Sequence, residues 1–448
     1  MGINQRQMSL GAFLFNYGHH YGAWRHPDSK VNGVIDLEFY KKSAQAAERG
    51  KFDMVFLADS SSVPSIQDAE TNVSFIYPEA LTVLGALTGL TERIGLAGTV
   101  STTFNEPYNL ARRFATLDHL SKGRAAWNVV TGTKETEARN FNADKLLEHS
   151  KRYERAREFL EVATGLWDSW EDEATVVDKQ LPRFADTSRI HPINHQGSNF
   201  RVDGPLNIPR SPQGRPVIIE AGTSPDGQKL AAQTADVVFT ATEDKEEAIR
   251  FYRQLKEQLP QYGRTPDQLK IMPGLLTFIG DTEEDAREKE RAFNAFINPD
   301  AAVTYLSKLI NVDLSGYPLD GPLPELPREG NTSRALMIMD MAKHTKMSIR
   351  DLGLHFSVAR GHLTITGTAQ QIADRIEDWF VSGACDGFNV MPPLLPDGLD
   401  EFVDKVVPLL QQRGLFRTEY TGHTLREHLG LTRPVSRFTA QPDSRTSF

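Results

Sequence analysis

The sequence has few of the features that mark secreted or membrane-spanning proteins. Its single cysteine, Cys385, cannot form a disulfide within the chain, which fits a reducing compartment. No apolar run approaches the ~20 residues that a transmembrane helix needs. The N-terminal stretch MGINQR also lacks the apolar core of a signal peptide. These absences predict a cytoplasmic protein with no membrane partner.

Positive charge and phosphate-binding motifs are also scarce. The 50 lysines and arginines are outnumbered by 59 aspartates and glutamates, which gives a formal net charge of -9. Nucleic acid is therefore not expected as a partner, because binding it requires a basic face. Gln228 stands where the Walker pattern has lysine, and Asp226 where the nucleophile elbow has glycine, which disfavours an NTPase or serine hydrolase. No metal site is predicted, since His191 and His195 lie in a loop-like segment without accompanying ligands.

Apolar strands alternate with amphipathic helices along the 448 residues. Strands are expected at residues 8–15, 54–59, 94–101, 125–131, 217–222, 237–240, 271–279 and 387–391. Helices are expected at residues 37–49, 77–90, 107–120, 148–170, from about 224, 246–259, 282–296, 370–380 and 399–412. Apolar strands without alternation are typical of a parallel sheet that is covered on both faces. The pattern predicts an α/β fold, a closed (β/α)8 TIM barrel, with an open doubly wound sheet as the alternative.

Two segments interrupt this rhythm. Residues 171–214 and 298–366 contain many prolines, asparagines and glycines and show no sustained period, so we expect insertions there, after the fourth and seventh units. Residues 1–432 would then form one barrel domain. The Pro, Ser, Arg and Gln content of residues 433–448 predicts a flexible tail.

Reactive groups of such a barrel are expected where strands end. Residues at these positions are Asp59, Ser101, Asn128, Thr131, Gly222 and Asn389. Asp59 ends a strand that is otherwise uncharged, so it either binds a ligand or caps the next segment. Gly222, Thr223 and Ser224 lead into a helix. They could cradle a phosphate, or form an ordinary turn in which Ser224 is the N-cap.

Histidine and tyrosine supply the other candidates. His19 and His20 precede Trp24 and Arg25, and they are the strongest acid–base candidates because histidine titrates near neutral pH. The alternative is that both histidines only pack or are solvated. Tyr153 lies on the apolar face of its helix, so its ring is expected in the core, although a phenol at the start of a helix can also reach a ligand.

Many motifs in the same order carry a family resemblance from Gln7 to about Leu431. They are GAWR (22–25), ERGKFD (48–53), FLAD (56–59), NEPY (105–108), TLDHLSKGR (116–124), WNVVT (127–131), EH (148–149), RY (152–153), GPLNIPR (204–210), PQG (212–214), DGFN (386–389) and FRTEY (416–420). Together they resemble the nitrilotriacetate monooxygenase, pristinamycin synthase and dibenzothiophene-sulfone monooxygenase group of the bacterial-luciferase superfamily.

The resemblance implies a luciferase-like TIM barrel that receives reduced FMN from a separate NAD(P)H:flavin reductase, by transient contact or diffusion. Such enzymes add O2 at the flavin C4a to form a peroxide and oxygenate a small organic substrate. Residues that match the family's FMN contacts are Asp59, Thr99, Tyr153 and Ser224, with Gly222 and Thr223 beside the phosphate and Asn128 and His149 as further matches. His20, or His19 in its place, would hydrogen-bond the flavin peroxide or the substrate. A homodimer or homotetramer is expected.

The resemblance narrows the substrate less than the cofactor. Thr133 stands where alkane-type members have histidine, which disfavours alkanes. TTFNEP (102–107) and GPLPE (321–325) are closest to the aminopolycarboxylate type, so Arg25, Arg360 and His362 could bind a carboxylated amine or thioether. Exposed surface is the alternative for Arg360 and His362.

Other substrates and functions remain open at this point. Aryl sulfones, N-heterocycles and chlorinated aromatics are oxidised elsewhere in the group, and no residue excludes them. Two alternative functions also fit a luciferase-like barrel. One is hydride transfer with F420 or a bound flavin, and the other is a flavin carrier without activity.

Overall fold

Eight parallel strands close into a ring in the computed structural model, which describes residues 6–30, 32–63, 66, 70, 76–326 and 333–439. In order around the ring they are β1 (Ser9–Leu14), β2 (Met54–Leu57), β3 (Gly95–Ser101), β4 (Ala125–Val130), β9 (Val217–Glu220), β10 (Val237–Thr240), β11 (Lys270–Gly280) and β13 (Gly387–Val390). Each strand pairs in parallel with the next, and β13 pairs with β1. The predicted TIM barrel is confirmed, and its strands are the eight predicted apolar segments.

Successive residues of a strand point to opposite sides of the ring. Met54 and Phe56 of β2 belong to the apolar cluster inside the barrel, together with Ala97 of β3. Val55 and Leu57 belong to the cluster between the strands and the helices. Both faces of the strands are therefore apolar, which explains why their sequences do not alternate.

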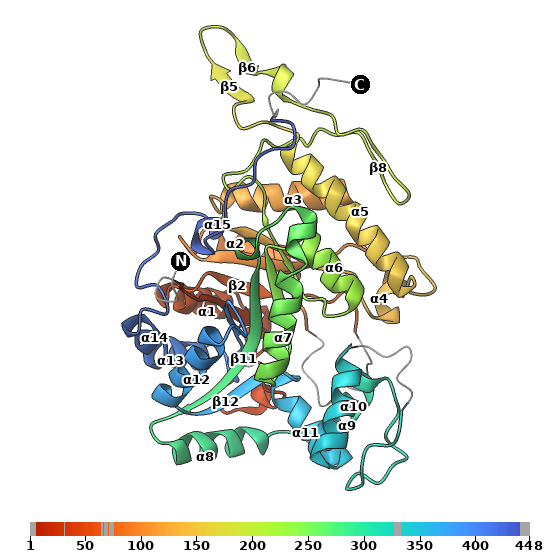
Figure 1. The fold of residues 1–448 in the computed structure, drawn as a ribbon, viewed down its shortest axis with the longest axis vertical. Helices are drawn as coiled ribbons and strands as arrows, with labels where there is room; N and C mark the ends of the chain where they lie inside the picture. The colour runs from red at the N-terminus through yellow and green to blue at the C-terminus, as the bar shows by residue number, and fades with distance from the viewer. Residues whose placement is uncertain are drawn as a thin grey trace.

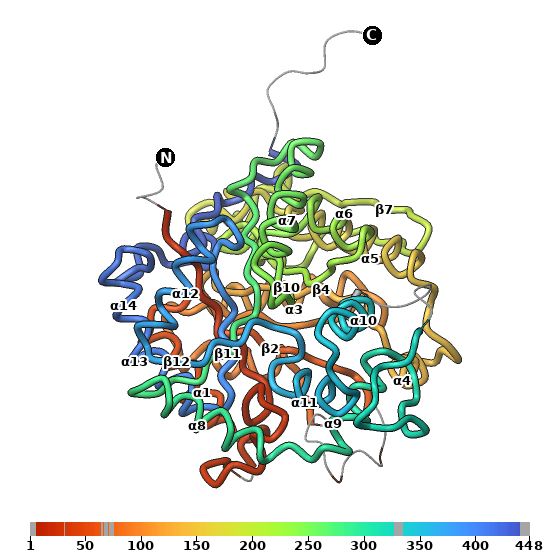
Figure 2. The backbone as a smooth tube through the Cα atoms, turned by 60° about the horizontal axis from the view of Figure 1, so that its bottom comes forward, coloured from red at the N-terminus to blue at the C-terminus, as the bar shows by residue number. Residues whose placement is uncertain are grey.

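Helices surround the strands, as Figure 2 shows. The predicted ones are α1 (Leu37–Arg49), α2 (Ala80–Leu87), α3 (Pro107–Leu120), α5 (His149–Asp168), α6 (Pro225–Thr234), α7 (Lys245–Lys256), α8 (Glu283–Asn294), α12 (Ala369–Val381), α13 (Asp397–Lys405) and α14 (Val407–Gln412). Two shorter ones, α4 (Glu135–Asn140) and α15 (Leu425–His428), add to them. Helix α1 buries Phe39, Tyr40, Ala44 and Ala47, whose spacing predicted it. Within the described chain, no helix is long and apolar enough to cross a membrane.

The segment 298–366 contains elements that the sequence pattern did not predict. They are α9 (Pro299–Ile310), α10 (Ser333–Thr345), α11 (Ile349–Ala359) and β12 (Leu363–Thr368). Strand β12 pairs with the second half of β11. The three helices share a small apolar core that includes Val303, Leu306, Leu352 and Phe356. They lie together at the end of the molecule where α8 follows β11 (Figures 1 and 2).

The segment 171–214 lies at the other end of the molecule (Figure 1). It forms two small hairpins, β5 (Thr175–Asp178) with β6 (Arg183–Ala185), and β7 (His195–Gln196) with β8 (Arg201–Val202). Their strands are two to four residues long, which is too short to give a periodic signal in the sequence.

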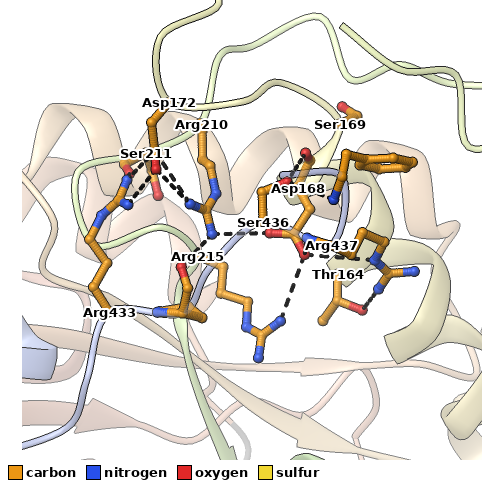
Figure 3. Close-up of polar contacts among 12 residues, drawn as sticks. Thr164, Asp168, Ser169, Asp172, Arg210, Ser211, Arg215, Arg433, Ser436 and Arg437 are labelled. Atoms are coloured by element: carbon orange, nitrogen blue, oxygen red, sulfur yellow. Dashed lines mark hydrogen bonds and ion pairs between the residues drawn. The ribbon is translucent and has the colours of Figure 1, made fainter. Parts of the chain in front are cut away.

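A polar cluster around Asp168, the last residue of α5, ties this segment to the C-terminal end of the chain (Figure 3). The side chain of Asp168 is 2% exposed, and its Oδ1 accepts a hydrogen bond from Nη2 of Arg210 at 3.2 Å. Arg437 lies 3.7 Å from its other oxygen, and Ser436 donates to its main-chain carbonyl. Ser436 and Arg437 thus contact the end of α5, although composition predicts a flexible tail for this stretch. Residues 440–448 lie outside the described part of the chain.

Replacing Asp168 by Asn should lower the free energy of unfolding by about 3 kcal/mol, because the buried guanidinium of Arg210 would lose a charged partner. Asp172→Asn is the matched control. Asp172 also pairs with Arg210 but its side chain is 46% exposed, so its loss should cost less than about 1 kcal/mol. Urea unfolding of the full chain measures both. Equal losses would contradict the role given to burial.

Candidate functional site

Aromatic rings line the mouth, by which we mean the surface at the C-terminal ends of the barrel strands. The ring of Phe13 lies 4.8 Å from Phe56, 5.7 Å from Phe239 and 4.4 Å from His19, between centroids and all in edge-to-face geometry. Phe15, directly after β1, stacks on His19 at 5.3 Å. Packed rings of this kind leave little room for water and strengthen any polar contact made against them.

Asn128 and Thr99 form a buried polar pair next to these rings. They are register partners on β4 and β3, and each is 4% exposed. Thr99 Oγ1 donates to the carbonyl of Leu57 at 2.8 Å and accepts from Asn128 Nδ2 at 2.9 Å. Among the described residues, none donates a hydrogen bond to Oδ1 of Asn128. A buried acceptor without a donor is costly, so this oxygen fits the N–H or O–H of a ligand.

Asn389, which the sequence places at a strand end, lies deeper in the barrel. It pairs with Gly11, which in turn pairs with Met54, two residues before Phe56. A Cβ on Gly11 would lie 2.7 Å from Oδ1 of Asn389. Asn389 therefore packs below the aromatic layer rather than at the mouth.

Gly222 and Ser224 form a tight turn at the start of α6, as the sequence predicts. Ser224 Oγ accepts a hydrogen bond from the backbone N–H of Gly227 at 3.2 Å, so Ser224 is the N-cap. A Cβ on Gly222 would lie 2.9 Å from Cα of Gly227 and 3.2 Å from the hydroxyl of Tyr153. That hydroxyl also hydrogen-bonds Ser224. We call Gly222, Thr223, Ser224, Gly227 and the Tyr153 hydroxyl the α6 cradle.

Charge around the α6 cradle is mixed. The ring of His149 lies 4.9 Å from that of Tyr153, and its Nδ1 lies 3.3 Å from a carboxylate oxygen of Asp226. Both side chains of this pair are about half exposed. The start of α6 adds the partial positive charge of a helix N-terminus, which favours an anion. A phosphate in the cradle would meet His149 and the helix end, with Asp226 held by the histidine.

Asp59 caps the next helix, which is one of the two alternatives that the sequence left open. Its Oδ2 accepts from the backbone N–H of Ala80, the first residue of α2, at 3.1 Å. Burial is the main cause that raises the pKa of the Asp59 carboxyl to about 6. Asp59 follows the last residue of β2 by two positions, so its carboxyl lies on the mouth side of Phe56.

The two adjacent histidines have different surroundings. His20 is turned toward α8, where its ring lies 5.4 Å from Phe293. Its Nε2 lies 3.0 Å from Oδ1 of Asn294, and its Nδ1 accepts from the backbone N–H of Gly22 at 3.1 Å. Burial lowers the pKa of His20 to about 4. His20 thus contacts α8, whereas the ring of His19 lies against Phe13 and Phe15, so the geometry favours His19 over His20 as the histidine of the mouth.

Arg360 directly follows α11 as its C-cap, in a left-handed backbone conformation with φ of 56°, and its side chain reaches the rings of the mouth. Its guanidinium carbon lies 4.3 Å from the ring centroid of Phe15, and its Nη1 lies 3.3 Å from Nδ1 of His19. No carboxylate in the described part of the chain forms an ion pair with it. Arg360 is thus a partly buried cation, and none of the described residues is its counter-ion.

The other two predicted substrate residues, His362 and Arg25, differ in burial. His362 is 4% exposed and stacks on Phe239 at 5.1 Å, so the alternative of exposed surface is wrong for it. Arg25 is exposed, and its Nη1 donates to the carbonyl of Phe296 at 2.7 Å.

A polar group beyond β4 was missed by the sequence analysis. Lys134 donates to Ser60 Oγ at 2.7 Å, and Glu137 accepts from Ser60 Oγ and from the backbone of Ser61, both at 3.3 Å. The ammonium of Lys134 also lies 5.8 Å from the ring centroid of Tyr77. The available signal was a pair of charged residues just after a strand end.

Glu220, the last residue of β9, is a buried carboxyl whose raised pKa can be tested by measuring stability as a function of pH. It is 3% exposed and accepts from Thr234 Oγ1 at 2.6 Å, and burial raises the pKa of its carboxyl to about 7. Between pH 4 and pH 8 the folded state therefore binds more protons than the unfolded state, so this group's contribution to stability falls as pH rises. Relative to Glu220→Gln, the wild type should lose about 3 kcal/mol over that range. Urea unfolding at both pH values checks this, with the exposed Glu288→Gln as control; a constant difference would refute it.

Comparison with known proteins identifies the family. The luciferase-like monooxygenase family model matches residues 13–386. N-acetyl-S-(2-succino)cysteine monooxygenase of Bacillus subtilis (strain 168) is 48% identical over 98% of this chain and 100% of its own. Nitrilotriacetate monooxygenase component A of Aminobacter aminovorans is 46% identical over 97% and 98%. The crystal structure of DmoA from Hyphomicrobium sulfonivorans has a TM-score of 0.87 at 34% identity, covering 95% and 92%. The chain therefore belongs to the luciferase-like monooxygenase family and is a flavin-dependent monooxygenase.

Proposed function

We propose that this protein is the oxygenating component of a two-component, FMNH2-dependent monooxygenase that acts on a small thioether or amine bearing carboxylates. The observation that carries the substrate class is Arg360. A guanidinium held on an aromatic ring, with no described carboxylate beside it, is stabilised by an anionic ligand. The names of two relatives, N-acetyl-S-(2-succino)cysteine and nitrilotriacetate monooxygenases, point to carboxylated compounds of these kinds.

The residues at the mouth fit FMN. The α6 cradle would hold the phosphate through Ser224, the Tyr153 hydroxyl and the start of α6, with His149 beside it. Oδ1 of Asn128, which has no donor among the described residues, would accept a hydrogen bond from the flavin ring system, with Thr99 and Asp59 beside it. When bound in its reduced form, the flavin supplies the two electrons with which one atom of O2 enters the product and the other leaves as water.

The protein contributes exclusion of water and placement of the substrate. The rings of Phe13, Phe15, Phe56 and Phe239 give the mouth a dry wall, which limits loss of the oxidant as hydrogen peroxide. Arg360 would fix a substrate carboxylate through paired N–H groups, so that the sulfur or nitrogen to be oxidised lies in one orientation. The component A in the name of one relative fits a separate NAD(P)H:flavin reductase as the source of FMNH2.

The first test supplies FMNH2 from a flavin reductase and follows O2 uptake, product and peroxide. We expect coupled product formation with N-acetyl-S-(2-succino)cysteine or nitrilotriacetate. Uncharged sulfides of similar size should bind more weakly and release more peroxide, because they lack the group that Arg360 orients. A panel in which every substrate yields only peroxide, or in which an aryl sulfone or N-heterocycle is the best substrate, would overturn the proposed substrate class.

A second test addresses the cofactor site. Tyr153→Phe should weaken FMN binding about tenfold, because one hydroxyl contact to the phosphate is lost. Riboflavin lacks the phosphate, so its binding should not change between wild type and variant. Quenching of flavin fluorescence measures both affinities.

The matched control is Tyr108→Phe, which removes a hydroxyl that lies 3.5 Å from the carbonyl of Pro205. Ser224→Ala should act as Tyr153→Phe does, with Thr282→Ala controlling for the loss of a helix cap, since Thr282 caps α8 in the same way. If FMN and riboflavin lose affinity equally in Tyr153→Phe, the cradle does not hold the phosphate.

A further inference from the structure

The partners of His19 fix which of its ring nitrogens carries the proton. Nε2 lies 2.9 Å from the carbonyl oxygen of Phe13, and a carbonyl can only accept, so Nε2 bears hydrogen. Nδ1 lies 3.3 Å from Nη1 of Arg360, and a guanidinium can only donate, so Nδ1 bears a lone pair. The imidazole is therefore neutral, with its proton on Nε2.

This state is held firmly. The ring of His19 is fully buried between Phe13 and Phe15. A second proton would have to sit on Nδ1, facing the guanidinium of Arg360. Burial, and then the charge of Arg360, hold the pKa of His19 well below its ordinary value. The one proton of His19 is directed at the backbone, and none is available to a substrate.

Arg360 receives its position from the same contacts. The face of Phe15 supports the guanidinium plane at 4.3 Å, and Nδ1 of His19 accepts one of its five N–H groups. A guanidinium on a flexible side chain loses conformational freedom when it binds, and these two contacts restrict that freedom in advance. The remaining N–H groups can form the paired contact that a carboxylate favours.

We propose that His19 is a positioning residue. It acts on the substrate only through Arg360, whose guanidinium it orients as the receptor for a substrate carboxylate. The proposal rests on the proposed function, deepens its substrate class, and replaces the proton-donating role that the sequence suggested for His19.

The test is a double-mutant cycle with succinate as the probe and the flavin-free full chain as the protein. Arg360→Met should weaken succinate binding by tenfold or more, and His19→Phe by about fivefold. The double variant should bind no more weakly than Arg360→Met alone, because His19 then has nothing left to orient. His19→Asn keeps an acceptor near the position of Nδ1 and should stay within about twofold of wild type. Isothermal titration calorimetry measures all four.

Steady-state kinetics distinguishes a positioning role of His19 from a catalytic one. With N-acetyl-S-(2-succino)cysteine, His19→Phe should raise KM more than it lowers kcat, and should remove no ionisation from the pH profile of kcat/KM. A matched control is His428→Phe, another buried histidine, whose Nε2 contacts the carbonyl of Gly422 far from the mouth. It should leave succinate binding unchanged.

Each outcome decides between the alternatives. Two results would show that His19 acts on the reacting atoms. One is loss of an ionisation from the pH profile of kcat/KM in His19→Phe. The other is a further fall of kcat when His19→Phe is added to the Arg360→Met variant. Wild-type succinate binding in Arg360→Met would refute the receptor while leaving the monooxygenase proposal intact. Absence of oxygenation with every carboxylated substrate, together with the expected binding cycle, would refute the proposed function and leave the His19–Arg360 pair standing. If His19→Phe does not fold, His19→Asn provides the test. Succinate binding in His19→Asn as weak as in Arg360→Met would contradict the claim that an acceptor at this position orients Arg360.

Discussion

The mouth depends on closure of the ring between β13 and β1. The backbone N–H of Ser9 donates to the carbonyl of Asp386 at 3.0 Å, and Gly387 lies so close that a Cβ there would be 1.8 Å from the carbonyl oxygen of Ser9. Only glycine permits this approach. Once β1 is seated, Phe13 meets Phe239 from the far side of the ring, and the chain leaving β1 brings His19 over them. The aromatic wall is thus a product of ring closure.

Much of this fold can be predicted from sequence because its signals are local. Apolar strands mark the ring, and the period of Phe39, Tyr40, Ala44 and Ala47 marks α1. Strand β12 carries a different signal, since Leu363–Thr368 alternates apolar and polar residues as a half-buried strand does, but it lies in the segment that was assigned to an insertion. It pairs with the second half of β11. Helices α9 and α11 bury their faces against each other rather than on the barrel, and proline-rich chain separates them. Their packing is a tertiary contact between segments far apart in the sequence, so no local sequence pattern predicts it.

The candidate site likewise has features that are local in the sequence and features that depend on distant residues. The turn at Ser224 could be predicted because a helix cap is a local structure, whereas its contact with Tyr153 spans about seventy residues and came only from the family resemblance. His19 and His20 are chemically identical neighbours, and the sequence analysis placed His20 first, with His19 as its substitute, for a hydrogen bond to the flavin peroxide or the substrate. Their roles are set by Arg360 and Asn294, which lie hundreds of residues away. A titratable side chain is defined by its partners, and partners at that distance leave no trace in the local pattern.

Arg360 and the residues proposed to contact the flavin belong to different parts of the molecule. Thr99, Asn128 and the α6 cradle are built on ring strands and the helices that follow them, so changing their geometry would disturb the barrel. Arg360 directly follows α11, which packs mainly in the apolar core of the segment 298–366 and also adds Ala359 to the cluster inside the barrel. The guanidinium of Arg360 contacts Phe15 and His19 at the mouth and does not fill the ring, so the identity of this side chain can change at small cost to the barrel. The proposed cofactor site is therefore constrained by the fold, whereas the proposed substrate site is free to differ on the same scaffold.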